Sequence, residues 1–327
     1  MVWADEPMHA QESTNGIRVS IATDADDHAA NLTGWKQAYD QLAPGRFRGT
    51  LRELWLGPEM QIFEETTSHA VRQSCEVWPG SVWFGIPVTG GPPGRIGLRA
   101  LDMSDIALRP GGVKFELLTP SSFRIFGLVV EKQLLLNYVA ETQRSELSPS
   151  VLDCEILHSC RAERSRLEAI LLSLFQHRGV WINCEQARDA LRDELLGLIT
   201  SNCMAGIAPD FPSLTYTGRY RLVHRVRDFA LAHKDESVSI PQLCQTFHVS
   251  RRTLQYAFQD VCGISPSAYL RTLRLNGVRR ALRAPQHPSA EVQDLAAQWG
   301  FWNPSQFACD YKRLFGERPS DTLVRPH

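Results

Sequence analysis

The spacing of hydrophobic positions divides the first part of the chain into two regions. In FRGTLRELWLG (47–57), MQIFEETTSHAVRQSCEVWPGSVWFGIPV (60–88) and SFRIFGLVVE (122–131), short apolar and β-branched runs are bounded by glycine and proline turns. This pattern predicts several strands of a small barrel or sandwich. From about Lys132 to Met204 the apolar residues recur at helical spacing, most clearly in LEAILLSLFQ and ARDALRDELLGLI. We therefore expect a β-rich region that is followed by helices.

The C-terminal part of the chain contains one pattern twice. FQDVCGISP, which begins at Phe258, and YKRLFGERP, which begins at Tyr311, place an aromatic residue, a glycine and a proline at the same spacing. Each is preceded by a short amphipathic stretch, SIPQLCQTF or EVQDLAAQW, and by a tight turn that is one residue longer in the second copy. A short helix, a turn and a second helix that ends at a glycine are typical of a helix-turn-helix. The sequence therefore predicts two such units.

The residues of the turns favour this interpretation. Gly300 can take a positive φ without a Cβ clash, and His248, at the equivalent place in the first copy, is a residue type that tolerates left-handed geometry better than most. Ser250 and Asn303 are good N-caps for the second helices. Between the copies, SPSAYLRTLRLNGVRRALRA predicts a long connecting helix that Gly277 weakens. Its packed side is expected to hold Tyr269, Leu270, Leu273 and Val278.

The second copy carries a resemblance to a known family. LAAQWGFWNPSQFACDYKRLFGERPS contains a small residue, Gly-Phe, Ser-x-Phe, Lys-Arg, Phe-Gly and Pro-Ser in order, and about a hundred C-terminal residues resemble the double helix-turn-helix domain of the AraC/XylS transcription regulators. The resemblance implies an all-α domain that binds double-stranded promoter DNA and acts together with RNA polymerase. A helical repeat unrelated to nucleic acid is the alternative interpretation.

The two second helices differ in the side chains that they direct outward. In the first unit Leu254 and Phe258 face inward, and the outward positions, which face base edges in the resembled family, include arginine for guanine and glutamine for adenine. In the second unit the matching positions include Ala308 and Cys309, which form few hydrogen bonds with bases. We therefore expect the first unit to specify the sequence and the second to position the protein on phosphates. The candidate DNA-binding residues are Arg251, Arg252, Gln255, Tyr256, Asn303, Ser305, Gln306, Lys312 and Arg313.

Composition separates the same two regions. The 327 residues include 43% apolar and 22% charged residues, which is normal for a globular chain of two domains. The net charge is −1, yet residues 216–327 hold 16 lysines and arginines against 9 aspartates and glutamates. A basic segment beside an acidic one indicates a module that binds a polyanion next to a module of another kind.

The expected fold class is α+β with two domains. Residues 1–204 are expected to form a ligand-sensing domain, with a small β-barrel or sandwich and then helices. Residues 205–218, AGIAPDFPSLTYTG, have the composition of a linker, and residues 219–327 form the double helix-turn-helix domain. Helices that follow a sensing barrel are where such regulators commonly dimerise, so the resemblance implies a homodimer.

Several other classes of function lack their sequence signals. The eight cysteines are scattered without a C-x-x-C pair, the N-terminus shows no signal-peptide pattern, and no long uninterrupted apolar stretch occurs. We therefore expect a cytoplasmic protein with reduced thiols that does not enter a membrane. No G-x-S-x-G, phosphate-binding glycine loop or H-E-x-x-H occurs, and His69 is the histidine of the strand region, so neither catalytic residues nor a metal site is expected. An enzyme with a DNA-binding tail is the rival from another class.

A narrower resemblance covers most of the chain. LTGWKQAYDQLAPGRFRG, VRQSCEVWPGSVWFGIPV and RPGGVKFELLTP resemble the regulators of ethanolamine-utilisation operons within the AraC/XylS family. This implies an activator of ethanolamine breakdown genes that responds to ethanolamine and adenosylcobalamin as effectors, and a response to another small amine is the alternative. A site for a small ammonium alcohol needs a carboxylate and an aromatic face. The candidate ligand-binding residues are Glu64, Glu65, Glu76, Trp55, Trp78 and Trp83. The alternative is a purely structural role, in which the tryptophans lie in the hydrophobic core and the carboxylates lie on the solvated surface.

Overall fold

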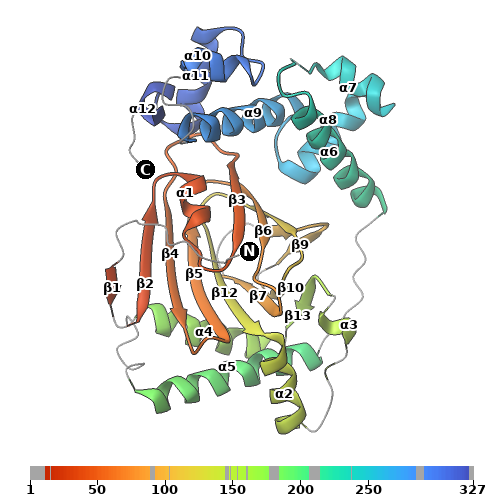
Figure 1. The fold of residues 1–327 in the computed structure, drawn as a ribbon. Helices are drawn as coiled ribbons and strands as arrows, with labels where there is room; N and C mark the ends of the chain where they lie inside the picture. The colour runs from red at the N-terminus through yellow and green to blue at the C-terminus, as the bar shows by residue number, and fades with distance from the viewer. Residues whose placement is uncertain are drawn as a thin grey trace. The chain divides into compact units, whose positions relative to one another are not determined.

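The structure is a computed structural model of the chain (Figure 1). It describes residues 12–14, 16–88, 93–102, 104–143, 147, 149–152, 154–159, 161–176, 184–205, 214–236, 238–284 and 291–323. Two compact units are present. The first comprises Met1–Tyr39 and Arg48–Asp210, and the second comprises Asp40–Phe47 and Phe211–His327.

The first unit is built on two antiparallel sheets. Its strands are β1 (Glu12–Thr14), β2 (Ile17–Ala22), β3 (Lys36–Gln41), β4 (Gly49–Trp55), β5 (Met60–Thr67), β6 (Val71–Glu76), β7 (Ser81–Pro87), β8 (Gly94–Ile96), β9 (Arg99–Leu101), β10 (Asp105–Pro110), β11 (Phe115–Thr119), β12 (Phe123–Glu131) and β13 (Ile156–His158). The larger sheet has the order β1-β2-β4-β5-β12-β7-β10-β13, and the smaller has the order β3-β6-β11-β8-β9. The short helix α1 (Ala25–Ala30) lies between β2 and β3.

Helices cover one face of the larger sheet. These are α2 (Lys132–Gln143), α3 (Pro149–Leu152), α4 (Arg161–Gln176) and α5 (Glu185–Ala205), drawn in yellow-green and green in Figure 1. The hydrophobic core of this unit joins sheet residues such as Ile62 and Leu128 to helix residues such as Leu171 and Leu195, all of them fully buried. The apolar stripes that the sequence predicted for α4 and α5 therefore pack against strands.

The other face of the larger sheet is lined by aromatic rings that lie over glycines. Gly85 and Gly127 are paired in register on β7 and β12. A Cβ atom would lie 2.3 Å from the ring of Trp83 at Gly85, and 2.0 Å from the ring of Phe63 at Gly127. Trp35, from the loop before β3, contacts both rings edge-on at centroid distances of 5.6 and 5.8 Å. Only glycine leaves room for rings this close to the backbone.

The second unit is helical. It contains α6 (Leu214–Ala232), α7 (Ile240–Phe247), α8 (Arg251–Cys262), α9 (Pro266–Arg283), α10 (Val292–Ala297), α11 (Pro304–Phe315) and α12 (Pro319–Leu323). The long connecting helix is confirmed as α9, which begins after the N-cap Ser265. Its predicted packed side is also confirmed, because Tyr269, Leu270, Leu273 and Val278 are buried.

Gly277 has a structural role that the sequence pattern did not predict. A Cβ atom at this position would lie 2.3 Å from ring carbons of Trp299, which follows α10. The glycine that weakens α9 as a helix therefore lets the helix approach a large aromatic side chain.

The α+β fold class is confirmed, with a β-rich region before a helical domain, but two local expectations need correction. Ile156–His158 lies in the region predicted to be helical, yet it forms β13 by antiparallel pairing with β10. The predicted linker, 205–218, includes Ala205 as the last residue of α5 and the first turn of α6, which begins at Leu214. Tertiary contacts override local composition at both places.

Candidate nucleic-acid interface and effector-binding residues

The first helix-turn-helix unit is fixed by its caps. The side-chain oxygen of Ser239 accepts a hydrogen bond from the backbone N–H of Gln242. The side-chain oxygen of Gln242 in turn accepts from the backbone N–H of Ser239, so α7 begins with a capping box. His248 ends this helix at φ 53°, which confirms the left-handed geometry predicted for it. Ser250, the predicted N-cap of α8, accepts from the N–H of Thr253 at 3.0 Å. These local bonds determine where α8 begins.

The two faces of α8 differ completely in exposure. Leu254, Ala257 and Phe258 have no exposed area, as predicted for the inward face. The four candidate DNA-binding residues of this helix, Arg251, Arg252, Gln255 and Tyr256, are all exposed. Their side chains offer guanidinium and amide donors, which suit the edges of bases in a major groove.

Arg252 and Tyr256 are one helical turn apart and contact each other. The guanidinium Nη2 of Arg252 donates to the hydroxyl of Tyr256 at 3.1 Å, and its carbon lies 5.3 Å from the ring centroid. A planar cation over an aromatic ring restricts the arginine side chain. The arginine is therefore held on the outward face before any ligand is bound.

The second unit has the same construction with different outward chemistry. Gly300 takes φ 73°, and the side-chain oxygen of Asn303 accepts from the N–H of Gln306 at 3.0 Å, which confirms both predicted turn residues. Asn303, Ser305, Gln306 and Lys312 are exposed. The carboxamide oxygen of Asn303 is committed to the cap, so its NH₂ group is what remains for a phosphate.

Arg313, a predicted phosphate contact, is partly committed to the protein. Its Nη2 donates to Asp310 at 2.8 Å, although the Arg313 side chain is 64% exposed. Asp310 is buried and also lies 3.5 Å from a guanidinium nitrogen of Arg271. Because the Arg313 side chain is largely in solvent and Asp310 retains Arg271 as a second partner, Arg313 can exchange this contact for a phosphate.

The candidate effector residues of the first unit do not all lie on one face. Glu64 and Glu65 are adjacent on β5, so their side chains point to opposite faces of the larger sheet. Glu64 is buried among the arginines Arg52 and Arg124, which donate to it at 2.9 and 2.5 Å. This carboxylate is therefore held in ion pairs on the face that the helices cover.

Glu65 lies on the aromatic-lined face and has several polar neighbours. It accepts from the hydroxyl of Tyr39 at 2.8 Å, and His28 Nε2 lies 3.0 Å from the same oxygen. Gln73 donates to its other oxygen at 3.4 Å. Burial, and then the negative charge of Glu65, raises the pKa of Tyr39 well above its usual value, so Tyr39 is a proton donor here. His28 and Tyr39 were not among the residues predicted from the sequence.

The three tryptophan candidates come from β4, from β7 and from the residues that follow β6. Trp83 is fully buried and stacks on Phe115 at 5.1 Å, and its indole N–H is buried without a hydrogen-bond partner. Trp55 and Trp78 lie 6.3 Å apart. Glu76, at the end of β6, pairs with the exposed Lys36 at 3.3 Å. The structure therefore brings Glu65, Trp55 and Trp83 onto one face of the sheet, while Glu64 lies on the other.

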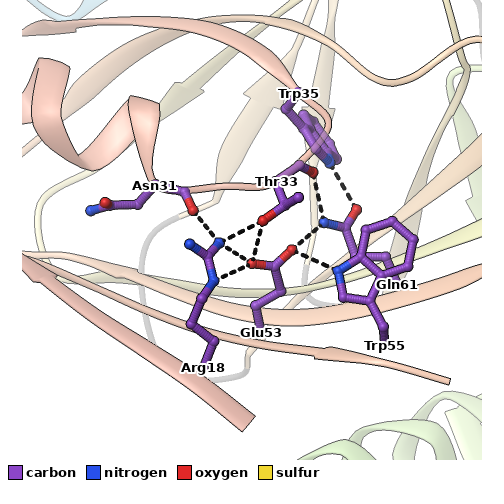
Figure 2. A network of polar contacts seen from close by, with 7 residues as sticks. All are labelled: Arg18, Asn31, Thr33, Trp35, Glu53, Trp55 and Gln61. Carbon is purple, nitrogen blue, oxygen red and sulfur yellow. Dashed lines mark hydrogen bonds and ion pairs between the residues drawn. The ribbon is translucent and has the colours of Figure 1, made fainter. Parts of the chain in front are cut away.

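Glu53, a carboxylate that was not predicted from the sequence, forms the centre of a polar network on this face (Figure 2). Its Oε1 accepts from Trp55 Nε1 at 3.1 Å and from Gln61 Nε2 at 2.6 Å. Its Oε2 accepts from Arg18 Nε at 2.9 Å and from the Thr33 hydroxyl at 3.1 Å. Alternation along β4 was the signal, because Glu53 occupies an inward position two residues before Trp55.

Gln61 extends this network to the loop before β3. It accepts from the indole N–H of Trp35 at 3.1 Å and donates to the backbone carbonyl of Thr33 at 2.9 Å. Arg18 also bonds to the backbone carbonyl of Asn31 and to the Thr33 hydroxyl. The network therefore holds in place the loop that inserts Trp35 between the sheets. The positive charge of Arg18 neutralises the buried Glu53 carboxylate.

Other sequence predictions concern metals, thiols and membranes. His69 Nδ1 lies 2.7 Å from the Ser68 hydroxyl. Within the described residues, no group of three or more His, Cys, Asp or Glu side chains could hold a metal ion. The seven cysteines of the described segments do not form disulfides. No helix in the same part of the chain is long and apolar enough to cross a membrane.

Comparison with known proteins points to the same C-terminal domain. Residues 243–325 match a protein family described as helix-turn-helix domain. The chain is 30% identical over 128 residues to the probable thc operon regulatory protein of Rhodococcus erythropolis, which is 38% of this chain and 39% of that protein. It is 29% identical over 129 residues to XylDLEGF operon transcriptional activator 3 of Pseudomonas putida, or 39% of each chain.

A solved structure shows a similar extent of likeness. A probable AraC family transcriptional regulator from Rhodopseudomonas palustris CGA009 is 32% identical, covers 32% of this chain and 99% of that one, and has a TM-score of 0.28. The chain spans only 39% of the length of the first two curated relatives. The named relatives are regulators rather than enzymes, in agreement with the expectation that this chain is not an enzyme. Through the helix-turn-helix domain of its second unit, the chain is therefore similar to transcription regulators of the AraC/XylS family.

Proposed function

We propose that this protein is a transcription activator that binds promoter DNA with its second unit. The observation that carries the proposal is the capped helix α8, which exposes Arg251, Arg252, Gln255 and Tyr256 while its other face is buried. In a helix-turn-helix the second helix lies in the major groove, and its N-terminal residues contact base edges. Helix α8 selects the sequence, and α11 positions the protein through Asn303, Ser305, Gln306, Lys312 and Arg313.

The effectors of this activator are ethanolamine and adenosylcobalamin. Support comes from the resemblance of segments in the first unit to regulators of ethanolamine-utilisation operons. Chemistry supports a small cation, because the buried Glu65 and Trp83 share one face of the larger sheet with the half-buried Trp55. RNA polymerase and a second copy of the chain are the protein partners that the resemblance implies, and the cytoplasm is the compartment.

Selection of DNA by the full-length protein tests the first part of this proposal. A library of random duplexes is passed over the protein to enrich the sequences that it binds. The Kd for the enriched duplex and the Kd for a shuffled duplex are then measured by fluorescence anisotropy. We expect one enriched sequence with a tighter Kd than the shuffled control, because direct readout separates specific from non-specific binding by roughly a thousandfold or more. Equal affinity for both duplexes would contradict sequence-specific binding.

A thermal-shift titration tests the effectors. Ethanolamine and adenosylcobalamin are added separately and together, with choline as the control amine. A ligand that binds the folded state raises the unfolding midpoint with its concentration. We expect a larger shift with both effectors than the sum of the separate shifts. A shift with a different small amine alone would retain the regulator and replace its effector.

A further inference from the structure

The turn of the second helix-turn-helix unit contains one residue more than the turn of the first. In the first unit Val249 separates the left-handed residue His248 from the N-cap Ser250. In the second unit Phe301 and Trp302 separate the left-handed Gly300 from the N-cap Asn303. The turn residues that precede α11 therefore include an additional aromatic side chain.

Of the two aromatic residues in this turn, Phe301 is the one that packs against the rest of the second helix-turn-helix unit. A hydrophobic residue just before the N-cap commonly packs on the fourth residue of the helix and fixes the entry of the chain. Trp302 is the residue just before the cap, but the ring that lies 5.1 Å from Phe307, the fourth helical residue, is Phe301. Phe301 also lies under the guanidinium of Arg274 at 5.4 Å. The core of the unit is closed without Trp302.

Trp302 is left in solvent. Its side chain is 71% exposed, the highest value among the large hydrophobic residues of the described segments that are exposed. Tryptophan has a large apolar side chain and is enriched at interfaces, so this exposed ring is available for contact with a ligand. Its position is immediately before the N-terminus of α11, and that end of the second helix is the part that meets bases in a helix-turn-helix.

The neighbouring surface accepts DNA but offers few hydrogen bonds to bases. The one carboxylate of α11, Asp310, is buried and paired with Arg271 and Arg313, so it does not repel phosphate. The exposed Cys309 and the half-buried Ala308 are small and weakly polar. Apolar side chains read bases through one feature of the major groove, the 5-methyl group of thymine.

We infer that Trp302 is a specificity-determining residue that contacts thymine methyl groups in the part of the binding site covered by α11. This inference rests on the proposed DNA binding and deepens it, since the second unit then reads sequence by apolar contact in addition to holding phosphates. The ligand class is double-stranded DNA with thymine at the contacted positions.

Replacement of thymine by deoxyuridine removes only the methyl group and gives a direct test. The full-length protein selects a sequence from random duplexes, and each thymine of that sequence is then replaced by deoxyuridine in turn. Affinities are measured by anisotropy for the wild type, Trp302→Ala and Trp302→Phe. Leu231→Ala, which removes another exposed apolar side chain of the same unit, is the matched control.

We expect Trp302→Ala to weaken binding to the selected duplex by about tenfold, within the range for one base contact. Deoxyuridine at the contacted position should weaken the wild type several-fold and leave Trp302→Ala unaffected, and Trp302→Phe should stay close to the wild type. Circular dichroism should show unchanged folding, because the side chain packs on little.

Three results would overturn the inference. Wild-type affinity of Trp302→Ala for every duplex would remove Trp302 from the DNA interface and leave the proposed function intact. A loss in Trp302→Ala that is equal for thymine and deoxyuridine duplexes would place the contact on the backbone and reject methyl readout. Failure of the wild type to select any sequence would reject the proposed function, and this inference with it.

Discussion

Gly277 lies in the middle of α9, and we predict that its replacement by alanine destabilises the second unit. Helix propensity alone gives the opposite sign, because alanine is favoured over glycine in a helix by about 1 kcal/mol. The structure places the new Cβ 2.3 Å from ring carbons of Trp299. Ordinary contact between carbon atoms is about 3.5–4 Å, so the ring must move by more than about 1 Å.

The net effect follows from these two terms. Forcing a methyl group into a packed contact typically costs about 1–3 kcal/mol. The ring of Trp299 also lies under the ammonium of Lys234 at 5.2 Å, and this contact is disturbed when the ring moves. After the gain in helix propensity is subtracted, we expect Gly277→Ala to lower the free energy of unfolding of this unit by about 1 kcal/mol.

Gly218 provides the matched control. It lies in α6, and a Cβ at this position would meet no atom within 4 Å. Gly218→Ala should therefore stabilise α6 by about 0.5–1 kcal/mol through propensity alone. Trp299→Ala in combination with Gly277→Ala should cancel the clash, so the cost of Gly277→Ala should disappear when the ring is absent.

Hydrogen exchange is a suitable assay because the chain has two units that need not unfold together. Peptides from α9 and α6 report the local free energy of opening in the full-length protein. Faster exchange of α9 in Gly277→Ala, with slower exchange of α6 in Gly218→Ala, is the expected outcome. Equal or slower exchange of α9 in Gly277→Ala would refute the close contact with Trp299.

Three further predictions concern both units. Arg252→Ala should relax sequence preference in selection from random duplexes, whereas Lys312→Ala should weaken all duplexes alike, and equal loss of preference in both variants would reject the division of labour between α8 and α11. Glu53→Gln should lower the stability of the first unit by about 3 kcal/mol, because it leaves the half-buried Arg18 without its carboxylate. Glu76→Gln, with an exposed lysine partner, should change that stability by less than about 1 kcal/mol in a urea titration. Burial raises the pKa of Tyr311 to about 12 from the ordinary 10.0. The neutral phenol therefore stabilises the folded state fully below about pH 10, and this contribution is lost as the pH rises from about 10 to about 12. The free energy of unfolding should fall by up to about 1.4 kcal/mol per pH unit in that range. In Tyr311→Phe the free energy of unfolding should fall less steeply between about pH 9 and about pH 11 than in the wild type. An unchanged slope would contradict the attribution of this loss to ionisation of Tyr311.

The helix-turn-helix units are the part of the structure that local sequence predicts best. Ser250 and Asn303 cap the helices that follow them, and Gly263 and Gly316 end these helices at φ 70° and 73°. Each of these interactions joins residues a few positions apart, so it can be inferred from spacing alone. The inward position of Leu254 follows from the same helical period.

The face of each carboxylate in the sheets could not be inferred in this way. Nearly every residue of β5 is buried, so MQIFEETT shows no alternation of exposed and buried positions and does not reveal which of Glu64 and Glu65 faces the helices. Glu53 was missed because its partners Arg18 and Gln61 reach it only through strand pairing. Three residues, Ile156–His158, became a strand because β10 offered an unpaired edge.

The sequence by itself determined the helical periods, the caps and the repeat, and through them the helix-turn-helix construction of the second unit. Only the tertiary structure decided which side chains meet between the sheets, why Gly277 stands in a long helix, and that Trp302 is exposed while Phe301 is packed. The physical reason is range. Capping bonds and helical periods act within one or two turns, whereas burial and strand register depend on residues that folding brings together from distant parts of the chain.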